Sequence, residues 1–332
     1  MGKLPIAELK KLLSCIGKDS RVVIPSMLGY DSGVHLLGDK YVVVASDPCT
    51  GVPKEWFGYL LVNYAASDLA LSGAKPEFCT INLLGPTSTK PDVFQEIMKQ
   101  TCSAAAELGI AIVRGHTGTY DAVSDLVGVA TVYGTVEPER LITAGNAKPG
   151  DLILCTKPLG LETITNFSLT HKPLAQKLFG IKQQEALSKQ VHLQSCVKEA
   201  MRLAEISGVH AMHDATEGGF VAALNEFAEA SKVGFNVEWE KIPIFKEALA
   251  LQSHFGLAEE QLLAMSSTGT ILAAVDPKVQ EQVKATLNKN GLCAYTIGQF
   301  TESIEKVLIK KGKETFFPAV ANDPYSMILS GK

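Results

Sequence analysis

The residues with the clearest chemical potential lie at 213–220, where the sequence reads HDATEGGF. Apolar residues recur at helical spacing just beyond, so an acid, a hydroxyl and two glycines lead directly into an amphipathic helix. Glycines let a backbone approach a ligand closely, and a helix N-terminus presents unpaired N–H groups to an anion. The alternative is an ordinary N-cap on a tight glycine loop. On the first interpretation the residues that contact the bound cofactor are Asp214, Thr216, Gly218 and Gly219.

Three aspartates of the first half lie where a solvated surface acid is not expected. Asp31 is in a turn of small residues, and Asp47 closely follows an apolar strand. Asp68 lies near the C-terminus of a nearly uncharged helix, where the helix dipole disfavours a negative charge. Each acid alone could be a cap, a turn former or a hydrogen-bonded core group. Together they predict a Mg²⁺ site, because Mg²⁺ prefers hard oxygen ligands and bridges carboxylates to nucleotide phosphates.

Two further groups of polar residues accompany these acids. Asn63 precedes Asp68 on the same helix and could serve as a ligand or a hydrogen-bond donor. The segment VRGHTG at 113–118 ends a strand with a mixture of residues that suits a polyanion, although a lone histidine is more often structural than catalytic. The candidates in this segment are Arg114, Gly115, His116 and Thr117.

The composition of the chain and the lack of certain motifs argue against several classes of protein. The 332 residues are 46% hydrophobic and 20% charged, and a net charge of −4 argues against a nucleic-acid partner held by a basic surface. Seven scattered cysteines without a CxxC pair fit a reducing compartment. We find neither a signal peptide nor an apolar run long enough to span a membrane, and expect a cytoplasmic protein. No GxxxxGK[ST] loop occurs, so ATP would need another architecture.

The elements that must position these residues alternate between strands and helices. In the first half we expect strands at 22–24, 41–45, 110–113 and 126–136, and helices at 55–72 and 91–108. In the second half we expect one long helix at 183–206 and strands at 152–155, 209–212, 270–275, 295–298 and 304–310. The segment GNAKPGD at 145–151 is the best linker candidate, which predicts domains at 1–147 and 148–332.

An ordered series of motifs along almost the whole chain resembles one superfamily. Its members are aminoimidazole ribonucleotide (AIR) synthetase, selenophosphate synthetase, thiamine-monophosphate kinase and the hydrogenase-maturation protein HypE, and the resemblance is nearest to uncharacterised HypE-like AIR synthase-related proteins. The motifs are GYDSGV at 29–34, SDP at 46–48, VNYAASDLALSGAKP at 62–76, RGHT at 114–117, DLILCTKPLG at 151–160, HDATEGGF at 213–220 and STGTILA at 267–273.

This resemblance implies a mixed α/β, two-domain, PurM-like fold. The N-terminal domain would form an intersubunit β-barrel in a homodimer, and the C-terminal domain an α/β sandwich. ATP and Mg²⁺ are the implied cofactors, with metal at Asp31, Asp47 and Asp68. The implied chemistry is phosphoryl transfer, often onto a carbonyl or amide oxygen, in which positioning and charge neutralisation lower the barrier. Lys157 and Arg114 are the implied phosphate partners, and Asp47, Asp68 and His116 the implied catalytic residues.

Several departures from the superfamily bear on the substrate. Cys15 and Lys18 are poor substitutes for the reactive pair of selenophosphate synthetases, and the chain ends YSMILSGK without the cysteine of HypE. Tyr30 replaces an acid of the family turn, and His116 stands where some members have an aspartate, so one metal ligand could be lost or changed. The acceptor stays unidentified.

Three functional hypotheses follow. The first is an ATP- and Mg²⁺-dependent phosphoryl-transfer enzyme related to HypE and AIR synthetase, and the second is a small-molecule kinase like thiamine-monophosphate kinase. The third is a nucleotide-binding regulatory or scaffold protein without turnover. A metal-dependent ATPase activity that is abolished by Asp68→Asn would exclude the third.

Overall fold

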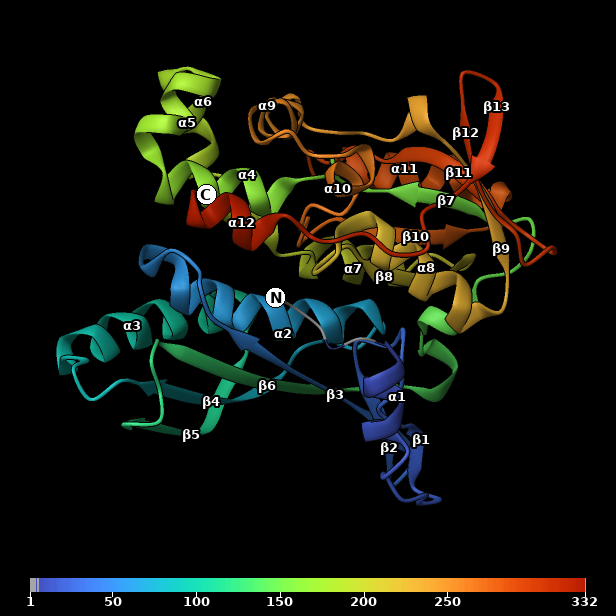
Figure 1. Ribbon diagram of the computed structural model, residues 1–332. Helices are drawn as coiled ribbons and strands as arrows, with labels where there is room; N and C mark the ends of the chain where they lie inside the picture. The colour runs from blue at the N-terminus through green and yellow to red at the C-terminus, as the bar shows by residue number, and fades with distance from the viewer. Residues whose placement is uncertain (1–3, 5, 332) are drawn as a thin grey trace. The chain divides into compact units, whose positions relative to one another are not determined.

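The computed structural model describes residues 4 and 6–331, and these form two units (Figure 1). The unit that we call the first-half unit comprises Asp19–Pro25 and Asp31–Leu141. The second-half unit comprises the described residues of Met1–Lys18, Ser26–Tyr30 and Ile142–Lys332. The chain passes between the units at Leu141 and Ile142, whereas the sequence predicts a boundary between residues 147 and 148.

The first-half unit contains a six-stranded sheet. The strands lie in the order β1 (Val22–Ile24), β2 (Gly33–Leu37), β3 (Lys40–Cys49), β6 (Val127–Val136), β4 (Phe78–Gly85) and β5 (Ala111–Thr119). Only β4 and β5 are parallel neighbours, and the helix α3 (Pro91–Leu108) makes the crossover that such a pair requires.

Helices cover one face of this sheet. The helix α2 (Phe57–Leu71) contacts β3 and β6, and α3 packs against α2 on the same side (Figure 1). Gly58 permits this close approach, because a Cβ atom there would lie 2.4 Å from the carbonyl oxygen of Ile97. Pro91 at the first turn and Gly109 in the left-handed conformation, with φ +71°, bound α3 where the sequence predicts.

The opposite face of the sheet carries no helix of the described first-half unit. Side chains alternate along each strand, so every second residue of β3, β4 and β6 points away from α2. These residues are half-buried or exposed, and most are apolar. The larger ones are Val42, Val44, Phe78, Leu84, Val129 and Tyr133.

The second-half unit contains a seven-stranded sheet. Its strands lie in the order β13 (Lys313–Phe316), β12 (Lys306–Lys310), β9 (Gly234–Glu238), β11 (Tyr295–Thr301), β7 (Leu152–Cys155), β10 (Ile271–Val275) and β8 (Val209–Asp214). All neighbours are antiparallel except β12 and β9.

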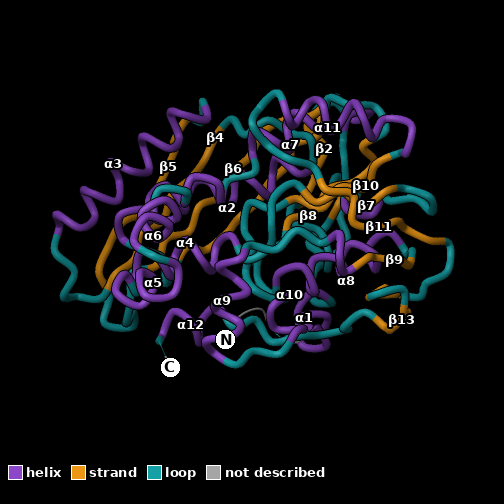
Figure 2. The backbone as a smooth tube through the Cα atoms, turned by 90° about the horizontal axis from the view of Figure 1, so that it is seen from above, coloured by secondary structure: helices purple, strands orange, loops and turns teal. Residues whose placement is uncertain are grey.

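Helices lie on both faces of this second sheet. Figure 2 shows α8 (Gly219–Ser231) on one side of β7, β10 and β11, and α7 (Val197–Ala204) with α11 (Gln280–Asn288) on the other. Phe220, Leu224 and Phe227 of α8 belong to the same buried cluster as Ile153 and Leu272 of the sheet. The mixed α/β fold class, with a sandwich in the second half, is confirmed.

The remaining helices of the second-half unit include a group around a second apolar cluster that contains Phe167 and Ile328. The α-helices are α1 (Ile6–Leu13), α4 (Leu161–Thr170), α5 (Lys172–Phe179), α6 (Ile181–Ser188), α9 (Lys246–Phe255), α10 (Glu259–Leu263) and α12 (Tyr325–Ser330). The short 3₁₀ helices of the chain are η1 (Lys54–Trp56), η2 (Pro138–Arg140), η3 (Ala144–Asn146), η4 (Val191–Gln194), η5 (Trp239–Lys241) and η6 (Pro277–Val279).

One element prediction was wrong. The expected single helix at 183–206 is three pieces, α6, η4 and α7, because carbonyl groups at the breaks bind a buried lysine described below. Across residues 4 and 6–331, none of the helices has the length and apolarity needed to cross a membrane.

Candidate functional site

The three candidate metal-binding aspartates of the first-half unit lie in separate segments of the chain. Asp47 is on β3, opposite Ala130 of β6, and shares the helix-covered face with the buried residues Val43 and Ala45. Asp31 lies just before β2, and the pairing of Gly33 with Val44 directs this turn toward the part of β3 that carries Asp47. Register therefore brings Asp31 close to Asp47.

A hydrogen bond links the turn of Asp31 to α2. The hydroxyl groups of Ser32 and Ser72 are 2.5 Å apart and both serines are buried. Ser32 follows Asp31 directly, while Ser72 is one helical turn beyond Asp68. The turn, the strand and the end of α2 thus hold the three aspartates in one region of the first-half unit.

These acids fit a metal that is shared with phosphates. All three are half-buried, and their oxygens are the hard ligands that Mg²⁺ prefers. Since Mg²⁺ keeps several waters and takes one or two carboxylates plus substrate phosphates, carboxylates gathered in one region suit a Mg²⁺–nucleotide complex.

Asn63 and the edge strand β5 contribute differently. The Asn63 side chain is buried, and its amide nitrogen donates to the carbonyl oxygen of Tyr59 at 2.9 Å. On β5 the segment 114–117 is exposed, which leaves the Arg114 guanidinium and the Thr117 hydroxyl at the surface. Nε2 of His116 lies 2.5 Å from the Tyr120 hydroxyl.

Gly115 has a structural explanation. A Cβ atom at this position would lie 2.4 Å from the carbonyl oxygen of Ile81 on β4. The register between β4 and β5 also shifts here, leaving Val113 as an extra residue between the paired positions. Close approach of two strands therefore accounts for the glycine without a ligand.

In the second-half unit, Asp214 ends β8 and is buried. It pairs with Ile271 of β10, and the next amide, of Ala215, donates to the carbonyl oxygen of Thr270 at 2.9 Å. The buried His213 donates from Nδ1 to the carbonyl oxygen of Asp214 at 2.9 Å, and its Nε2 lies 3.5 Å from a Glu226 carboxylate oxygen. These contacts fix the strand end from which the Asp214 carboxylate projects.

The glycines beyond Asp214 already have partners. Gly218 donates its N–H to the carboxylate of Asp323 at 3.0 Å, and Gly219 donates to the carbonyl oxygen of Thr216 at 2.9 Å. Both glycines have positive φ, and a Cβ at Gly219 would lie 2.5 Å from the carbonyl oxygen of Met265. The turn thus needs glycine for its own packing, and a carboxylate occupies the place where the sequence predicts a phosphate.

Lys157 is buried, and its ammonium group is bound by the protein. Nζ lies 2.6 Å from a Glu199 carboxylate oxygen and donates to the carbonyl oxygens of Leu193, Ser195 and Gly269 at 2.8, 2.9 and 2.8 Å. An ammonium has only three N–H donors. The prediction that Lys157 binds a phosphate therefore finds no support here, because these acceptors already saturate it.

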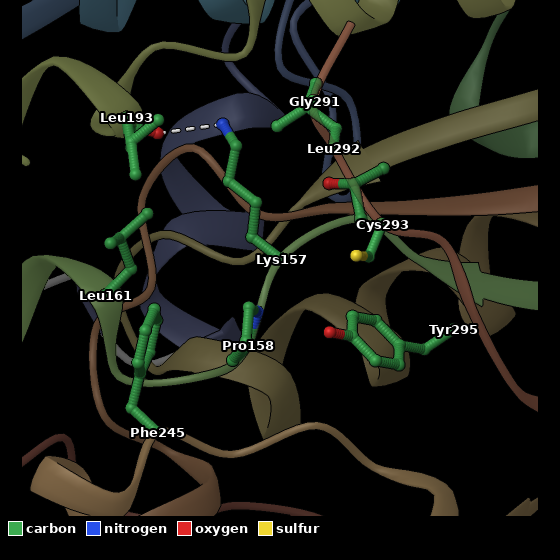
Figure 3. Close-up of a pocket in the computed structure, with 10 residues that line it drawn as sticks. Lys157, Pro158, Leu161, Leu193, Phe245, Gly291, Leu292, Cys293 and Tyr295 are labelled. Atoms are coloured by element: carbon green, nitrogen blue, oxygen red, sulfur yellow. Dashed lines mark hydrogen bonds between the residues drawn. The ribbon is translucent and has the colours of Figure 1, made fainter. Parts of the chain in front are cut away.

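A cavity of about 170 Å³ opens beside Lys157 (Figure 3). Pro158, Leu161 and Phe245 form apolar walls, and Tyr295 and Cys293 supply a phenol and a thiol. Burial, together with a hydrogen bond to Cys293, raises the pKa of Tyr295. Figure 3 shows the Lys157 side chain directed toward the Leu193 carbonyl oxygen, to which its ammonium donates. This lining does not match the needs of a triphosphate.

Sequence reasoning missed Asp323 and Glu199. Neither lies in a motif with a recognisable chemical pattern, and their partners are 105 and 42 residues away along the chain. The only local signal is the position of Asp323 two residues before Tyr325, which is typical of a carboxylate that caps a following helix.

Each half of the chain matches a protein-family model. Residues 29–136 match the model of the AIR synthase related protein, N-terminal domain, and residues 148–311 match that of its C-terminal domain. A protein of Methanocaldococcus jannaschii, provisionally named a hydrogenase expression/formation protein, is 27% identical over 291 residues, covering 84% of this chain and 82% of that protein.

Two further similarities concern an enzyme and a solved structure. A selenide, water dikinase of Aeromonas hydrophila is 28% identical over 288 residues, covering 86% of this chain and 77% of the enzyme. The crystal structure of hydrogenase maturation protein HypE in complex with ATP superposes with a TM-score of 0.73 at 19% identity, covering 94% of this chain and 91% of that one. The latter similarity shows the fold alone.

Proposed function

Because the chain belongs to the family of AIR synthase-related proteins, we propose that it binds ATP with Mg²⁺ and transfers the γ-phosphoryl group to an oxygen of a small acceptor. The observation that carries this proposal is the placement of Asp31, Asp47 and Asp68 in one region of the first-half unit. Mg²⁺ takes one or two carboxylates together with substrate phosphates, which is the role proposed for these acids.

The relatives support ATP-dependent phosphoryl transfer in general. A dikinase is an ATP-dependent phosphoryl-transfer enzyme. The Aeromonas relative with that name aligns with this chain over 77% of the enzyme's length. A protein with the same fold has been crystallised with ATP. Neither similarity identifies the acceptor of this chain.

The residues of this chain would act by positioning and by neutralising charge. Mg²⁺, when bound, offsets the negative charge that the transferring phosphoryl group carries. Asp31, Asp47 and Asp68 would hold metal in the first-half unit, and Asp214, at the end of β8, is the carboxylate of the second-half unit that is proposed to contact nucleotide-bound Mg²⁺. The exposed guanidinium of Arg114 is the proposed phosphate contact on β5. Lys157, Gly115 and Gly219 have structural roles in this account.

His116 and Asn63 take secondary parts in the proposal. The hydrogen bond to Tyr120 orients the His116 ring at the surface of β5, where it could contact a substrate. Asn63 commits its amide nitrogen to Tyr59, which leaves its side-chain oxygen as the atom that could face a ligand.

The experiment is a Mg²⁺-dependent turnover assay that follows phosphate release from ATP, with Asp68→Asn as the test variant. Asp92→Asn is the control, because Asp92 is an exposed acid in the first turn of α3 of the same unit. We expect turnover in the wild type and the control and its loss in Asp68→Asn. Tight ATP binding with no turnover on any acceptor would instead favour a regulatory nucleotide-binding protein.

We also propose that the first-half unit mediates a homodimer. The face of its sheet opposite α2 carries half-buried apolar residues that a second copy could cover, among them Val42, Val44 and Val129. Sedimentation equilibrium is the test: a dimer that becomes monomeric with Val44→Glu supports this interface, and a wild-type monomer at micromolar concentration contradicts it.

A further inference from the structure

The carboxylate of Asp323 connects three segments of the second-half unit. One oxygen, Oδ2, accepts from the Gly218 N–H at 3.0 Å and from the Ser266 hydroxyl at 3.0 Å. The other, Oδ1, accepts from the Tyr325 N–H at 2.8 Å. The C-terminal segment is therefore tied to the loop that leads into α8 and to the loop that precedes β10.

These two loops flank Asp214. The strands β8 and β10 pair up to Asp214 and Ile271, and main-chain hydrogen bonds continue from Ala215 to Thr270 and from Ser267 to Ala215. Beyond that point the two segments stay close, because the Ser266 hydroxyl lies 3.4 Å from the Thr216 carbonyl oxygen and a Cβ on Gly219 would lie 2.5 Å from the Met265 carbonyl oxygen. Asp323 adds a side-chain bridge between Gly218 and Ser266, directly past Asp214.

The position of Asp323 is also fixed from its other side. The Tyr325 hydroxyl accepts a hydrogen bond from the Asn166 side chain on α4 at 2.8 Å, and Ile328 of α12 is fully buried. Burial raises the pKa of Asp323, while hydrogen bonds from Gly218, Tyr325 and Ser266 oppose that rise. The carboxylate faces the N-terminus of α8, where the helix dipole favours a negative group.

We propose that Asp323 is a positioning residue that fills the anion position at the start of α8 and thereby fixes the loop that follows Asp214. The Gly218 amide then serves this internal carboxylate and does not bind a nucleotide phosphate. The glycines shape the turn, and Asp214 alone of this motif contacts the metal–nucleotide complex. This inference rests on the proposed function, since it assigns Asp214 to Mg²⁺–ATP binding.

The test compares variants by calorimetric titration with Mg²⁺ and a non-hydrolysable ATP analogue. Removing a residue that orients a metal ligand typically costs roughly 10- to 100-fold in affinity, so we expect at least a tenfold loss for Asp323→Ala. Asp323→Asn keeps an acceptor oxygen, so its affinity for the analogue should lie between those of Asp323→Ala and the wild type. The control is Asp276→Ala, because the Asp276 carboxylate also accepts a backbone N–H, from Lys278 at 2.9 Å, but lies at the opposite end of β10 from the Ser266 loop.

Chemical rescue makes the test specific to the anion position. In Asp323→Ala, added sodium formate should restore part of the lost affinity and raise the melting temperature, relative to sodium chloride at equal ionic strength. It should change neither value in the wild type. A purely structural loss of packing would not respond to formate.

The outcomes separate the two proposals. Tighter nucleotide binding by Asp323→Ala would overturn the inference, because it would mean that Asp323 competes with a phosphate for Gly218. The inference would also be overturned if Asp323→Ala bound the analogue as tightly as Asp276→Ala, or if formate did not relieve its loss of affinity. If the wild type binds no nucleotide, the proposed function fails, and formate rescue of the melting temperature still reports whether the anion position exists.

Discussion

Replacing Lys157 by methionine tests whether this lysine is a structural residue or a phosphate ligand. Its ammonium binds Glu199 and the carbonyl oxygens of Leu193, Ser195 and Gly269, and the Lys157 and Glu199 side chains are only 5% and 7% exposed. Methionine keeps much of the length and apolar volume but has neither charge nor N–H donors. The substitution therefore leaves a buried carboxylate without its cation.

The expected loss of stability is large. Removing one partner of a buried ion pair costs about 3–5 kcal/mol. At about 2–4 °C per kcal/mol for a unit of this size, the melting temperature should fall by roughly 6–20 °C. The double variant Lys157→Met/Glu199→Leu removes the buried charge and should recover part of this loss. It should stay below the wild type, because three carbonyl oxygens still lack their donor, at about 1–3 kcal/mol for each that stays unsatisfied.

Calorimetric melting measures these values, and Lys241→Met is the matched control. The Lys241–Glu238 pair has the same 2.6 Å separation, but its side chains are 53% and 43% exposed. Such a pair contributes at most about 1 kcal/mol. The reasoning is refuted if Lys157→Met melts like the wild type and loses affinity for the Mg²⁺–ATP analogue, since that result would make Lys157 a phosphate ligand.

The other predictions concern glycine and cysteine positions. Gly115→Ala should lower the melting temperature by several degrees, because its Cβ would collide with the Ile81 carbonyl oxygen, whereas Gly17→Ala meets no atom within 4 Å and should change little. In native protein a thiol reagent should modify only the exposed cysteines, Cys15, Cys102 and Cys293, and modification of a buried thiol before unfolding would contradict the burial. Burial raises the pKa of Cys79 to about 11 and that of Cys155 to about 12. Thiols of the unfolded chain ionise first, so the urea midpoint should fall as pH rises above 9, and Cys155→Ala should make that fall shallower.

Local patterns in the sequence predicted the elements whose ends are set locally. The helix α3 begins at Pro91 and ends before Gly109, and both signals are visible in the sequence. The strand β7 at 152–155 follows a glycine-rich linker and was predicted with the correct bounds. In both cases the information lies within a few residues of the boundary.

Elements shaped by distant contacts were not predicted. The periodicity of 183–206 indicates one helix, but Leu193 and Ser195 turn their carbonyl groups toward Lys157, which lies on a distant strand end. The gain from satisfying a buried ammonium outweighs the local helical preference. No pattern within the segment carries that information.

The candidate site shows the same difference between local sequence signals and distant contacts. Asp31, Asp47 and Asp68 stand out because an acid among apolar neighbours is locally unusual, and the register of β2 and β3 then places two of them close together. The glycines at 218 and 219 stand out too, but their partners Asp323 and Met265 come from remote segments. Sequence alone therefore located the loop but did not reveal that the Gly218 amide donates to a carboxylate of this chain.

The most direct test of the central claim is calorimetric titration of the purified protein with a non-hydrolysable ATP analogue, with and without Mg²⁺. The account predicts binding that requires Mg²⁺, that is lost in Asp47→Asn, and that is retained in the exposed control Asp92→Asn. Equal binding by all three proteins, or no binding by a folded wild type at millimolar analogue and Mg²⁺, would contradict it.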